Sequence, residues 1–430
     1  MKFGRRGGDG AQKGLAKGHG ENLVLKRTLV WFLLILGVLL LLLVGLITIT
    51  GPDFPAKVIN RHADMGNFPL SEQAIKLHKT LFVADLHADS LLWERDLAVA
   101  SDAGHVDLPR MRQGHLSLQV FSAVSQVPFG LNLYSNSHNS DMLFLTFIWQ
   151  RWPVSTWFNI EERALYQAHK LHRLAARESE GLYVIKNQEG LAGYLNALAD
   201  KPVLAGLLAL EGVQPIAGKW ENFFRLYKAG YRMMGLTHFF DNQVAGSAHG
   251  EQKHGLTPFG KQLIPAMESL GIVVDLAHAS AQTIDEVLSI ASKPVVVSHT
   301  GVKGTCDTAR NLSDNQIRAI ARNGGLIGIG YWSQAVCDIT PKGVVAAIKY
   351  VADLVGSQHV GLGSDYDGAV KTAFDVSEVS YLTEALLQQG FSEGDIRRIM
   401  GGNILRLLRE TLINESASSA ALLQLEGLLN

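Results

Sequence analysis

Short apolar runs that alternate with longer amphipathic segments are the feature that most constrains the fold of this chain. The short runs are Leu81–Asp85, Leu116–Val124, Leu182–Lys186, Val203–Leu210, Tyr231–Thr237, Ile272–Leu276, Pro294–Ser298, Leu326–Tyr331 and His359–Gly363. Helical periodicity lies between them, in segments that include Ile160–Arg177, Pro258–Leu270, Ser280–Ala291, Asp314–Asn323 and Lys342–Val355. Strands that alternate with helices predict a parallel sheet in an α/β domain.

Nine candidate strands predict a (β/α)8 TIM-type barrel with one strand to spare. Such a barrel takes about 250 residues and can exceed about 400 with insertions, so this chain of 430 residues accommodates one. We place Leu182–Lys186 outside the barrel. An open, doubly wound sheet is the structural alternative, but the sequence lacks the glycine-rich loops that would bind a nucleotide in such a sheet.

An uncharged apolar segment, Leu29–Ile49, precedes this domain. As a helix, its roughly 21 residues span a hydrocarbon core of roughly 30 Å. The 28 residues before it carry seven Lys and Arg against one Asp and one Glu, a net charge of +5, and positive flanking charge favours the cytoplasmic side. We therefore predict a single N-terminal transmembrane helix with everything from Gly51 onward outside. Cleavage of the segment as a signal sequence is the alternative.

The predicted organisation has five parts. These are a basic cytoplasmic arm over 1–28, a transmembrane helix over 29–49, a connector over 50–70, the barrel over 71–415 and a tail over 416–430.

Composition excludes several classes of protein. The 39 Lys and Arg balance 40 Asp and Glu, so no excess of positive charge attracts nucleic acid. An apolar fraction of 47% excludes an intrinsically disordered chain. The two cysteines, Cys306 and Cys337, are too few for a disulfide framework or a cysteine-rich zinc module.

Residues that bind metals or transfer protons end six of the predicted strands. They are His87 with Asp89, Glu211, His238, His278, His299 and Asp365. His87 and Asp89 are two positions apart, so in an extended segment both side chains point to the same face. Any one of these residues would be unremarkable as a structural histidine or a helix N-cap. Because the carboxyl ends of barrel strands meet at one mouth, six such endings together predict a shared site.

The residue types at these strand ends indicate a metal centre. Imidazoles and carboxylates without thiolates suit zinc or another first-row divalent ion. Three imidazoles and two carboxylates exceed what one tetrahedral ion needs, which favours two ions that share a bridging carboxylate and a bridging hydroxide. The pattern therefore predicts a bimetal hydrolase.

The sequence around these residues resembles the membrane dipeptidase (renal dipeptidase) family of zinc metallopeptidases, within the amidohydrolase-type barrels. The segments that carry the resemblance are Asp85–Asp89, His105–Arg112, Leu210–Gly212, Leu236–Asn242, Gly255–Gly260, Asp275–His278, Val297–Thr300, Ala309–Leu312, Gly324–Gly325 and Gly363–Gly368. They occur in the family's order from about residue 70 to 410. The resemblance thus covers the whole predicted barrel.

The resemblance implies two zinc ions held by five side chains. The ligands would be His87, Asp89, Glu211, His278 and His299. The first two would hold one ion and the last two the other, with Glu211 bridging both.

The resemblance also implies three residues that contact the substrate. His238 would sit beside the scissile carbonyl and stabilise the developing oxyanion. Arg310 would bind the C-terminal carboxylate of a dipeptide, for which a guanidinium is well shaped. Asp365 would handle protons, by pairing with the substrate ammonium or with the attacking water.

Several other residues are expected to be structural. Asp367 would serve a turn, Asp275 would support a neighbouring ligand, and His105 and His249 would be structural or loop residues. The aromatic residues around Phe144–Phe158 would belong to the core or to a pocket wall. Asp241–Gly250 would line the substrate pocket.

The resulting interpretation is a membrane-anchored dizinc dipeptidase that acts on free dipeptides. A bacterial inner membrane with the barrel in the periplasm is expected, because the C-terminus lacks the lipid-anchor signal of the vertebrate relatives. The expected partners are dipeptides and the membrane but no nucleic acid, and a homodimer is left open. Two other functions are weighed: a related hydrolase of another small amide, lactam or lactone, and a non-catalytic tethered binding barrel.

Overall fold

The computed structural model describes residue 1 and residues 10–63, 68–178 and 181–429. The chain divides into two units, Met1–Pro52 and Asp53–Asn430. The first unit contains α1 (Gly10–Thr50), and its part Leu25–Thr50 is the one described helix that is long and apolar enough to cross a membrane, with a mean hydropathy of 3.2.

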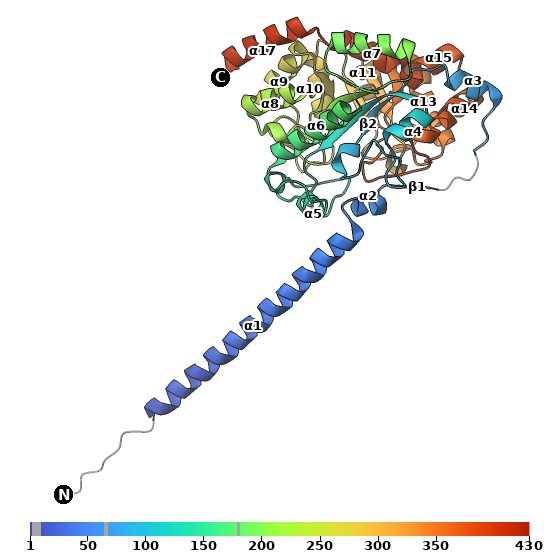
Figure 1. Ribbon diagram of the computed structural model, residues 1–430. Coiled ribbons are helices and arrows are strands. Elements are labelled where there is room, and N and C mark those ends of the chain that lie inside the picture. Colours follow the sequence, from blue (N-terminus) through green and yellow to red (C-terminus); the bar gives the residue numbers. More distant parts are fainter. Residues whose placement is uncertain (2–9, 64–67, 179–180, 430) are drawn as a thin grey trace. The chain divides into compact units, whose positions relative to one another are not determined.

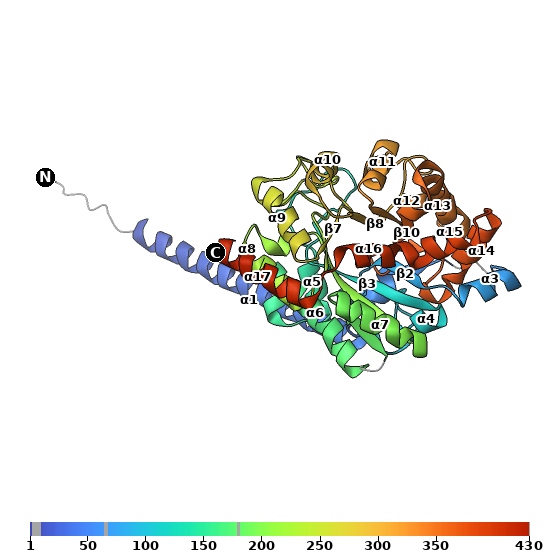
Figure 2. The same ribbon diagram turned by 90° about the horizontal axis from the view of Figure 1, so that it is seen from above.

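The second unit is a closed parallel barrel of eight strands (Figures 1 and 2). The barrel strands are β2 (Val83–Ala88), β3 (Leu116–Val124), β5 (Leu204–Glu211), β6 (Met233–Gly235), β7 (Val273–Asp275), β8 (Val296–Thr300), β9 (Leu326–Ile329) and β10 (Val360–Leu362). They are joined in the order β3-β2-β10-β9-β8-β7-β6-β5, and the pairing of β3 with β5 closes the ring. The predicted fold class is confirmed.

The ninth predicted strand is real but lies outside the ring. β4 (Leu182–Ile185) pairs with the first half of β5, from Leu204 to Leu207, and β6 pairs with β5 further along, at Ala209 and Leu210. Both neighbours therefore share one edge of β5, while β3 occupies the other edge. The placement of Leu182–Lys186 outside the barrel is confirmed.

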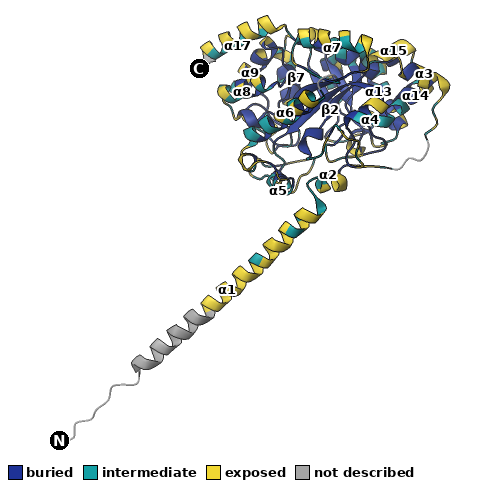
Figure 3. Cartoon of the chain, viewed as in Figure 1, coloured by how far each residue is buried: buried dark blue, intermediate teal, exposed yellow. Residues whose placement is uncertain are grey.

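Helices cover the outside of the barrel, and every residue of the eight strands is buried (Figure 3). Burial on both faces explains why these strands read as continuous apolar runs. The longer covering helices are α6 (Ile160–Arg177), α7 (Gln188–Asp200), α8 (Trp220–Ala229), α9 (Pro258–Ser269), α10 (Ala281–Ile290), α11 (Asp314–Arg322), α13 (Pro341–Val355), α14 (Ser380–Gln388), α16 (Asn403–Thr411) and α17 (Glu415–Leu429). The predicted helices agree with α6, α9, α10, α11 and α13 to within two residues at each end.

Local sequence explains where several of these helices begin. The Thr257 and Ser280 hydroxyls accept the backbone N–H groups of Gly260 and Thr283, which caps α9 and α10. At α11, Ser313 and Gln316 form a reciprocal capping box. These caps fix the helices that follow β6, β7 and β8, and thereby the strand ends that carry His238, His278 and His299.

The segment between β3 and α6 is a long insertion at the mouth of the barrel. It contains α5 (Leu143–Trp149) and the turn η2 (Val154–Thr156). Ahead of the barrel, the unit opens with α2 (Phe54–Ile59) and α3 (Glu72–His78).

Candidate metal centre and active site

Four imidazole rings converge on one carboxylate oxygen at the mouth of the barrel. The Nε2 atoms of His278, His299, His238 and His87 lie 3.1, 3.4, 3.5 and 3.6 Å from Oε1 of Glu211. All five side chains are buried, and each follows or ends a different barrel strand. The closed parallel ring therefore brings together residues up to 212 positions apart, as the strand-end pattern predicts.

Two further carboxylates, Asp89 and Asp365, lie beside His87. Nε2 of His87 is 3.3 Å from Oδ1 of Asp89 and 4.0 Å from Oδ1 of Asp365. Nε2 of His87 and Oδ1 of Asp89 are buried without a hydrogen-bond partner among the described residues. Buried polar atoms without partners are uncommon in folded proteins, so these atoms fit ligands of an ion.

Two of the site residues have a left-handed backbone. The φ angles are 62° at His278 and 61° at Asp365, a region that residues with a Cβ seldom adopt. Such conformations cluster at functional sites, where the surrounding structure enforces them.

Residues of the neighbouring strands orient the imidazoles. The hydroxyl of Ser298 lies 2.9 Å from Nδ1 of His299, which turns Nε2 of that ring towards Glu211. The Asp275 carboxylate accepts the backbone N–H groups of Ala277 and Ser298. Asp275 thus supports the ends of β7 and β8, as expected of a residue that positions the metal ligands next to it.

Burial sets the protonation of this cluster. It lowers the pKa of His278 and His299 well below the ordinary value, so both rings are neutral and present lone pairs. Burial also opposes the charged form of His87, but the Asp89 and Glu211 carboxylates outweigh it and raise its pKa to about 10.

Burial raises the pKa of two carboxylic acids of the site. Burial, reinforced by the charge of Asp89, raises the pKa of Glu211 well above its ordinary value. Burial likewise raises the pKa of Asp365 to about 8. Carboxylates crowded in this way lack positive charge, and a divalent cation would supply it.

Arg310 lies beside the imidazoles without an ion-pair partner among the described residues. It is buried, donates to the carbonyl of His299 at 2.6 Å, and lies over the ring of Trp332 at 5.8 Å. Burial lowers its pKa to about 10, although the charge of Asp365 opposes that shift. A desolvated guanidinium without a counterion is a receptor for an anion.

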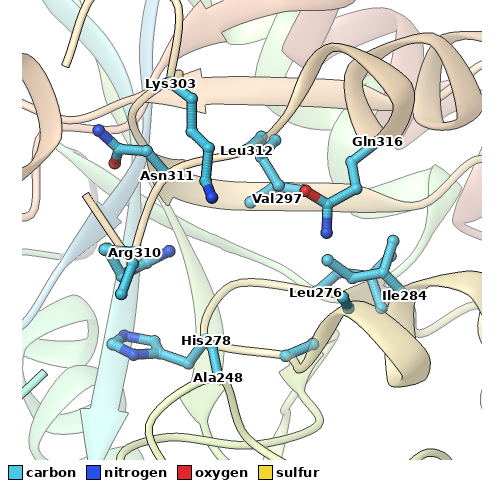
Figure 4. A pocket seen from close by; sticks show the side chains of 13 residues that line it. Ala248, Leu276, His278, Ile284, Val297, Lys303, Arg310, Asn311, Leu312 and Gln316 are labelled. Atoms are coloured by element: carbon cyan, nitrogen blue, oxygen red, sulfur yellow. The ribbon is translucent and has the colours of Figure 1, made fainter. Parts of the chain in front are cut away.

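A small cavity of about 130 Å³ adjoins Arg310 and His278 (Figure 4). Its walls are largely aliphatic and include Leu276 and Ile284, and the ammonium of Lys303 points into it. No ion pair of Lys303 is found within the part of the chain that the structure describes.

A disulfide fixes the loop that carries Arg310. Cys306 and Cys337 are joined, and the Asn311 amide donates to the carbonyls of Cys306 and Ala335. The loops after β8 and β9 are therefore tied together next to the guanidinium. Two cysteines are too few for a disulfide framework, and this single bond between them was not predicted from the sequence.

A larger cavity of about 440 Å³ opens beside the strand ends. Asp241, Asn242 and Gln243 line it together with Gln126 and Asn136. The segment Asp241–Gly250 thus contributes to the walls of both cavities, and that it lines the substrate pocket stays a prediction.

His249 is a site neighbour that sequence reasoning assigned to a loop. Its ring lies 5.2 Å from that of His278, and its Nδ1 lies 2.8 Å from the carbonyl of Leu133. Ser247 donates to the carbonyl of His238 and holds this loop against the site. No strand-end pattern marks His249 in the sequence, since it lies in the loop between β6 and α9.

Asp367 was expected to serve a turn, and its side chain instead joins the turn to neighbouring segments. Asp367 is fully buried and accepts from Ser90, from Arg95 and from the backbone of His105. It lies in the turn after β10 and does not join the imidazole cluster.

A closed parallel barrel with imidazoles and carboxylates gathered at its mouth defines a metal-dependent barrel hydrolase. A model of the membrane dipeptidase family, peptidase family M19, matches residues 71–421. The chain belongs to this family. It is therefore a metallopeptidase and a dipeptidase, as the sequence motifs predict.

Individual relatives agree with this assignment. The chain is 27% identical over 318 residues to the dipeptidase tcpJ of Claviceps purpurea. The aligned region covers 72% of this chain and 69% of that protein. It is 29% identical over 315 residues to the dipeptidase aclJ of Aspergillus oryzae, which covers 71% and 69%.

Solved structures show the same fold. A metallo peptidase from Rhodobacter sphaeroides, liganded with a phosphinate mimic of the dipeptide L-Ala-D-Ala, is 22% identical with a TM-score of 0.63 over 77% of this chain and 99% of that one. The probable dipeptidase PvdM from Pseudomonas aeruginosa is 20% identical with a TM-score of 0.65 over 79% and 98%.

Proposed function

We propose that this chain is a membrane-anchored dipeptidase that holds two zinc ions at the barrel mouth. The observation that carries the proposal is the convergence of four imidazole Nε2 atoms on one oxygen of Glu211. His87 and Asp89 would hold one ion, His278 and His299 the other, and Glu211 both. When bound, the two ions supply a water of lowered pKa and positive charge for the carbonyl oxygen.

The protein side chains then position and polarise the peptide bond. His238 is buried and its pKa lies well below the ordinary value because burial disfavours the imidazolium. As a neutral ring it can donate one N–H to the carbonyl oxygen as negative charge develops there. Asp365 lies 4.0 Å from Nε2 of His87, and it would pair with the substrate ammonium or hold the proton of the attacking water.

Arg310 would restrict the enzyme to dipeptides. A dipeptide presents its carboxylate one residue beyond the scissile bond, and the buried guanidinium lies next to His299 and His278. The cavity of about 130 Å³ would take the side chain of that second residue, with Lys303 available to an acidic one.

The N-terminal helix would be a permanent anchor. Its 26 residues from Leu25 to Thr50 rise roughly 39 Å, more than the hydrocarbon core of roughly 30 Å. The disulfide between Cys306 and Cys337 supports an oxidising compartment for the barrel, such as the periplasm. The basic arm supports an N-terminus in the cytoplasm.

The rival functions differ in testable ways. A hydrolase of another small amide, lactam or lactone would accept substrates without a free carboxylate, and a binding barrel would turn over none. A panel of free and blocked dipeptides, in both stereochemical forms at the second residue, separates these functions. All five ligand positions of the family motif are filled in this chain, which favours catalysis.

Removing the metal is expected to abolish dipeptide hydrolysis and to lower the melting temperature by several degrees. Without cations, the buried carboxylates of Asp89, Glu211 and Asp365 are left close together, and an ion that binds only the folded state stabilises it. Before and after chelation, elemental analysis measures the metal content, calorimetry the melting temperature and an assay the rate of dipeptide hydrolysis. Zinc should restore all of them at two ions per chain, and full activity with a single ion would contradict the dinuclear centre.

The barrel is expected to be accessible from outside the cytoplasm. Protease added to spheroplasts should digest a tag at the C-terminus, because the arm with a net charge of +5 precedes the apolar span. Inverted vesicles provide the control, in which the tag should be protected. Digestion only in inverted vesicles would show the opposite orientation.

A further inference from the structure

The insertion between β3 and α6, residues 125–159, has an apolar surface that the catalytic site does not use. Seven of its large apolar side chains are exposed: Phe129, Leu131, Tyr134, Met142, Leu145, Val154 and Phe158. With Phe54, Val58 and Ile59 of α2 they make up ten of the fifteen exposed large apolar residues described from Asp53 onward. We call these ten residues the apolar patch. Their gathering in one insertion and in the helix packed on it favours an interaction surface.

The patch corrects one expectation from the sequence. The aromatic residues around Phe144–Phe158 were predicted to lie in the core or in a pocket wall. Phe147 and Trp152 are indeed buried, but the side chain of Phe158 is 81% exposed. Its ring stacks on Phe144 at 5.8 Å, so it has a defined place on the surface.

The insertion is fixed to α6 by the side chain of Arg163. The buried guanidinium of Arg163 donates to the carbonyls of Ser125, Thr156 and Trp157 and pairs with Asp141 at 2.5 Å. These bonds join both ends of the insertion to α6. The patch is therefore displayed on an ordered segment.

The chain reaches this segment directly from the apolar helix. Only three residues separate the end of α1 at Thr50 from the start of α2 at Phe54. Ala56 of α2 is fully buried in a cluster with Leu143 and Phe147 of α5, and Phe54 stacks on Trp149 at 5.8 Å. Within the catalytic unit, α2 and α5 thus lie side by side (Figures 1 and 3).

We propose that the apolar patch rests on the surface of the lipid bilayer in which the N-terminal helix is anchored. This inference depends on the proposed anchor, because a span that ends at Thr50 leaves α2, and the α5 packed on it, within a few residues of the membrane. Tyrosine is enriched at that interface, and phenylalanine and leucine are among the side chains that segments lying on a bilayer bury at the headgroup boundary.

The charges of the insertion fit the same partner. Asp141 and Arg151 are its only Asp, Glu, Lys or Arg residues, and Asp141 already pairs with Arg163. Burial of the patch at the headgroup boundary therefore desolvates few charged groups. Covalent attachment raises the local concentration of the patch at the membrane, so a modest intrinsic affinity is enough.

The exposed apolar residues of the insertion are separate from the two cavities at the barrel mouth. Asn136 and His138 of the insertion line the cavity of about 440 Å³, whereas none of the seven apolar residues lines either cavity. Changes in the patch should therefore alter membrane contact while hydrolysis of soluble dipeptides is retained.

A nitroxide label at Val154 of the full-length chain, reconstituted in phosphatidylcholine–phosphatidylglycerol vesicles, tests the proposal. The chain has two cysteines and both are in the disulfide, so Val154→Cys provides a single free thiol. Leu423→Cys on α17 is the matched control, because both side chains are aliphatic and 71% exposed. The ratio of collisions with oxygen, which enters the lipid, to collisions with an aqueous nickel chelate is measured for each label.

The expected ratio is severalfold higher at position 154 than at 423, and the second change Phe158→Asp should lower it towards the control value. A label at 154 that is as exposed to nickel as the control overturns the proposal. Protection of position 154 from both reagents also overturns it, since a second copy of the chain or another protein would then cover the patch.

Flotation of the vesicles distinguishes the two ways in which this inference can fail. If the chain floats with the vesicles but the label is in water, the anchor stands and the bilayer contact does not. If the chain does not float, the anchor fails and the contact falls with it. Neither labelled position lines a cavity, so both labelled variants should hydrolyse dipeptides within about twofold of the unmodified chain. This rate confirms that their barrels are folded.

Discussion

Replacement of Glu211 by glutamine is expected to lower kcat/KM for dipeptides by about a hundredfold to several thousandfold. One oxygen of this side chain faces four imidazole nitrogens at 3.1 to 3.6 Å. A neutral amide cannot offset the repulsion of two cations there. Removal of one charge from a buried pair costs about 3–5 kcal/mol, and about 1.4 kcal/mol corresponds to tenfold in rate.

The same variant should also lose metal, which distinguishes a ligand from a residue that only supports the fold. Glu211→Asp keeps the charge but shortens the side chain, so it should retain part of the metal with low activity. Glu268→Gln is the matched control, because Glu268 is a buried glutamate that accepts from Ser292 and Lys293 away from the site. Two bound ions with near-native activity in Glu211→Gln would refute the dinuclear assignment.

The fold was predictable because a parallel barrel imposes strong periodic constraints on a sequence. Each strand is buried on both faces and each covering helix has a polar side, so the two patterns differ clearly. The run that became β4 has the same composition as a barrel strand. Nine runs for eight barrel strands predict that one run lies outside the ring. Its pairing partner was not predictable, because β5 offers a free edge to β4 only where β6 has not yet begun.

The candidate site was predictable where residues lie at strand ends and less so elsewhere. The seven predicted site residues at strand ends are buried at the mouth of the barrel, because parallel topology brings strand ends together. Arg310, on the loop after β8, is buried beside them, and its role was expected only from the family resemblance. His249 lies on a loop whose path is set by the bonds of Ser247 and Asn136. The contact of Ser298 with His299 was not predictable, because it depends on how the imidazole ring is turned. The disulfide was not predictable either, because it forms only where the loops after β8 and β9 meet in space.

The domain limits and the roles of the site residues are predictions of a different kind. The structure divides the chain between Pro52 and Asp53, inside the predicted connector, and it places a helix, α17, in the predicted tail. Neither observation decides where the catalytic domain begins and ends in function. A homodimer also stays a prediction.

Arg310→Met is expected to lower kcat/KM for free dipeptides by roughly 30-fold to several thousandfold while both metals are retained. Loss of one partner from a buried, hydrogen-bonded charge pair costs about 2–5 kcal/mol, and about 1.4 kcal/mol is tenfold. Burial of the guanidinium means that water does little to screen this interaction. Lysine should rescue the activity only in part, because a point charge cannot bind a carboxylate in two places.

The position of Arg310 makes a metal measurement necessary for this variant. The guanidinium donates to the carbonyl of His299, so its removal could also shift a metal ligand. Arg232→Met is the matched control, since Arg232 is a buried arginine that donates to backbone carbonyls remote from the site. It should destabilise the fold without a change in substrate selectivity.

A comparison of each dipeptide with its C-terminal amide isolates the carboxylate. A dinuclear barrel could cleave many amides, so restriction to dipeptides requires a group that recognises the chain end at a fixed distance from the scissile bond. For the unmodified enzyme the amide should be a poor substrate, because it leaves the guanidinium buried and unpaired. In Arg310→Met the free dipeptide should fall to about the level of its amide, and the amide should lose little more. If the substitution lowers both substrates by the same factor, Arg310 does not bind the carboxylate, and substrate length must be measured elsewhere in the site.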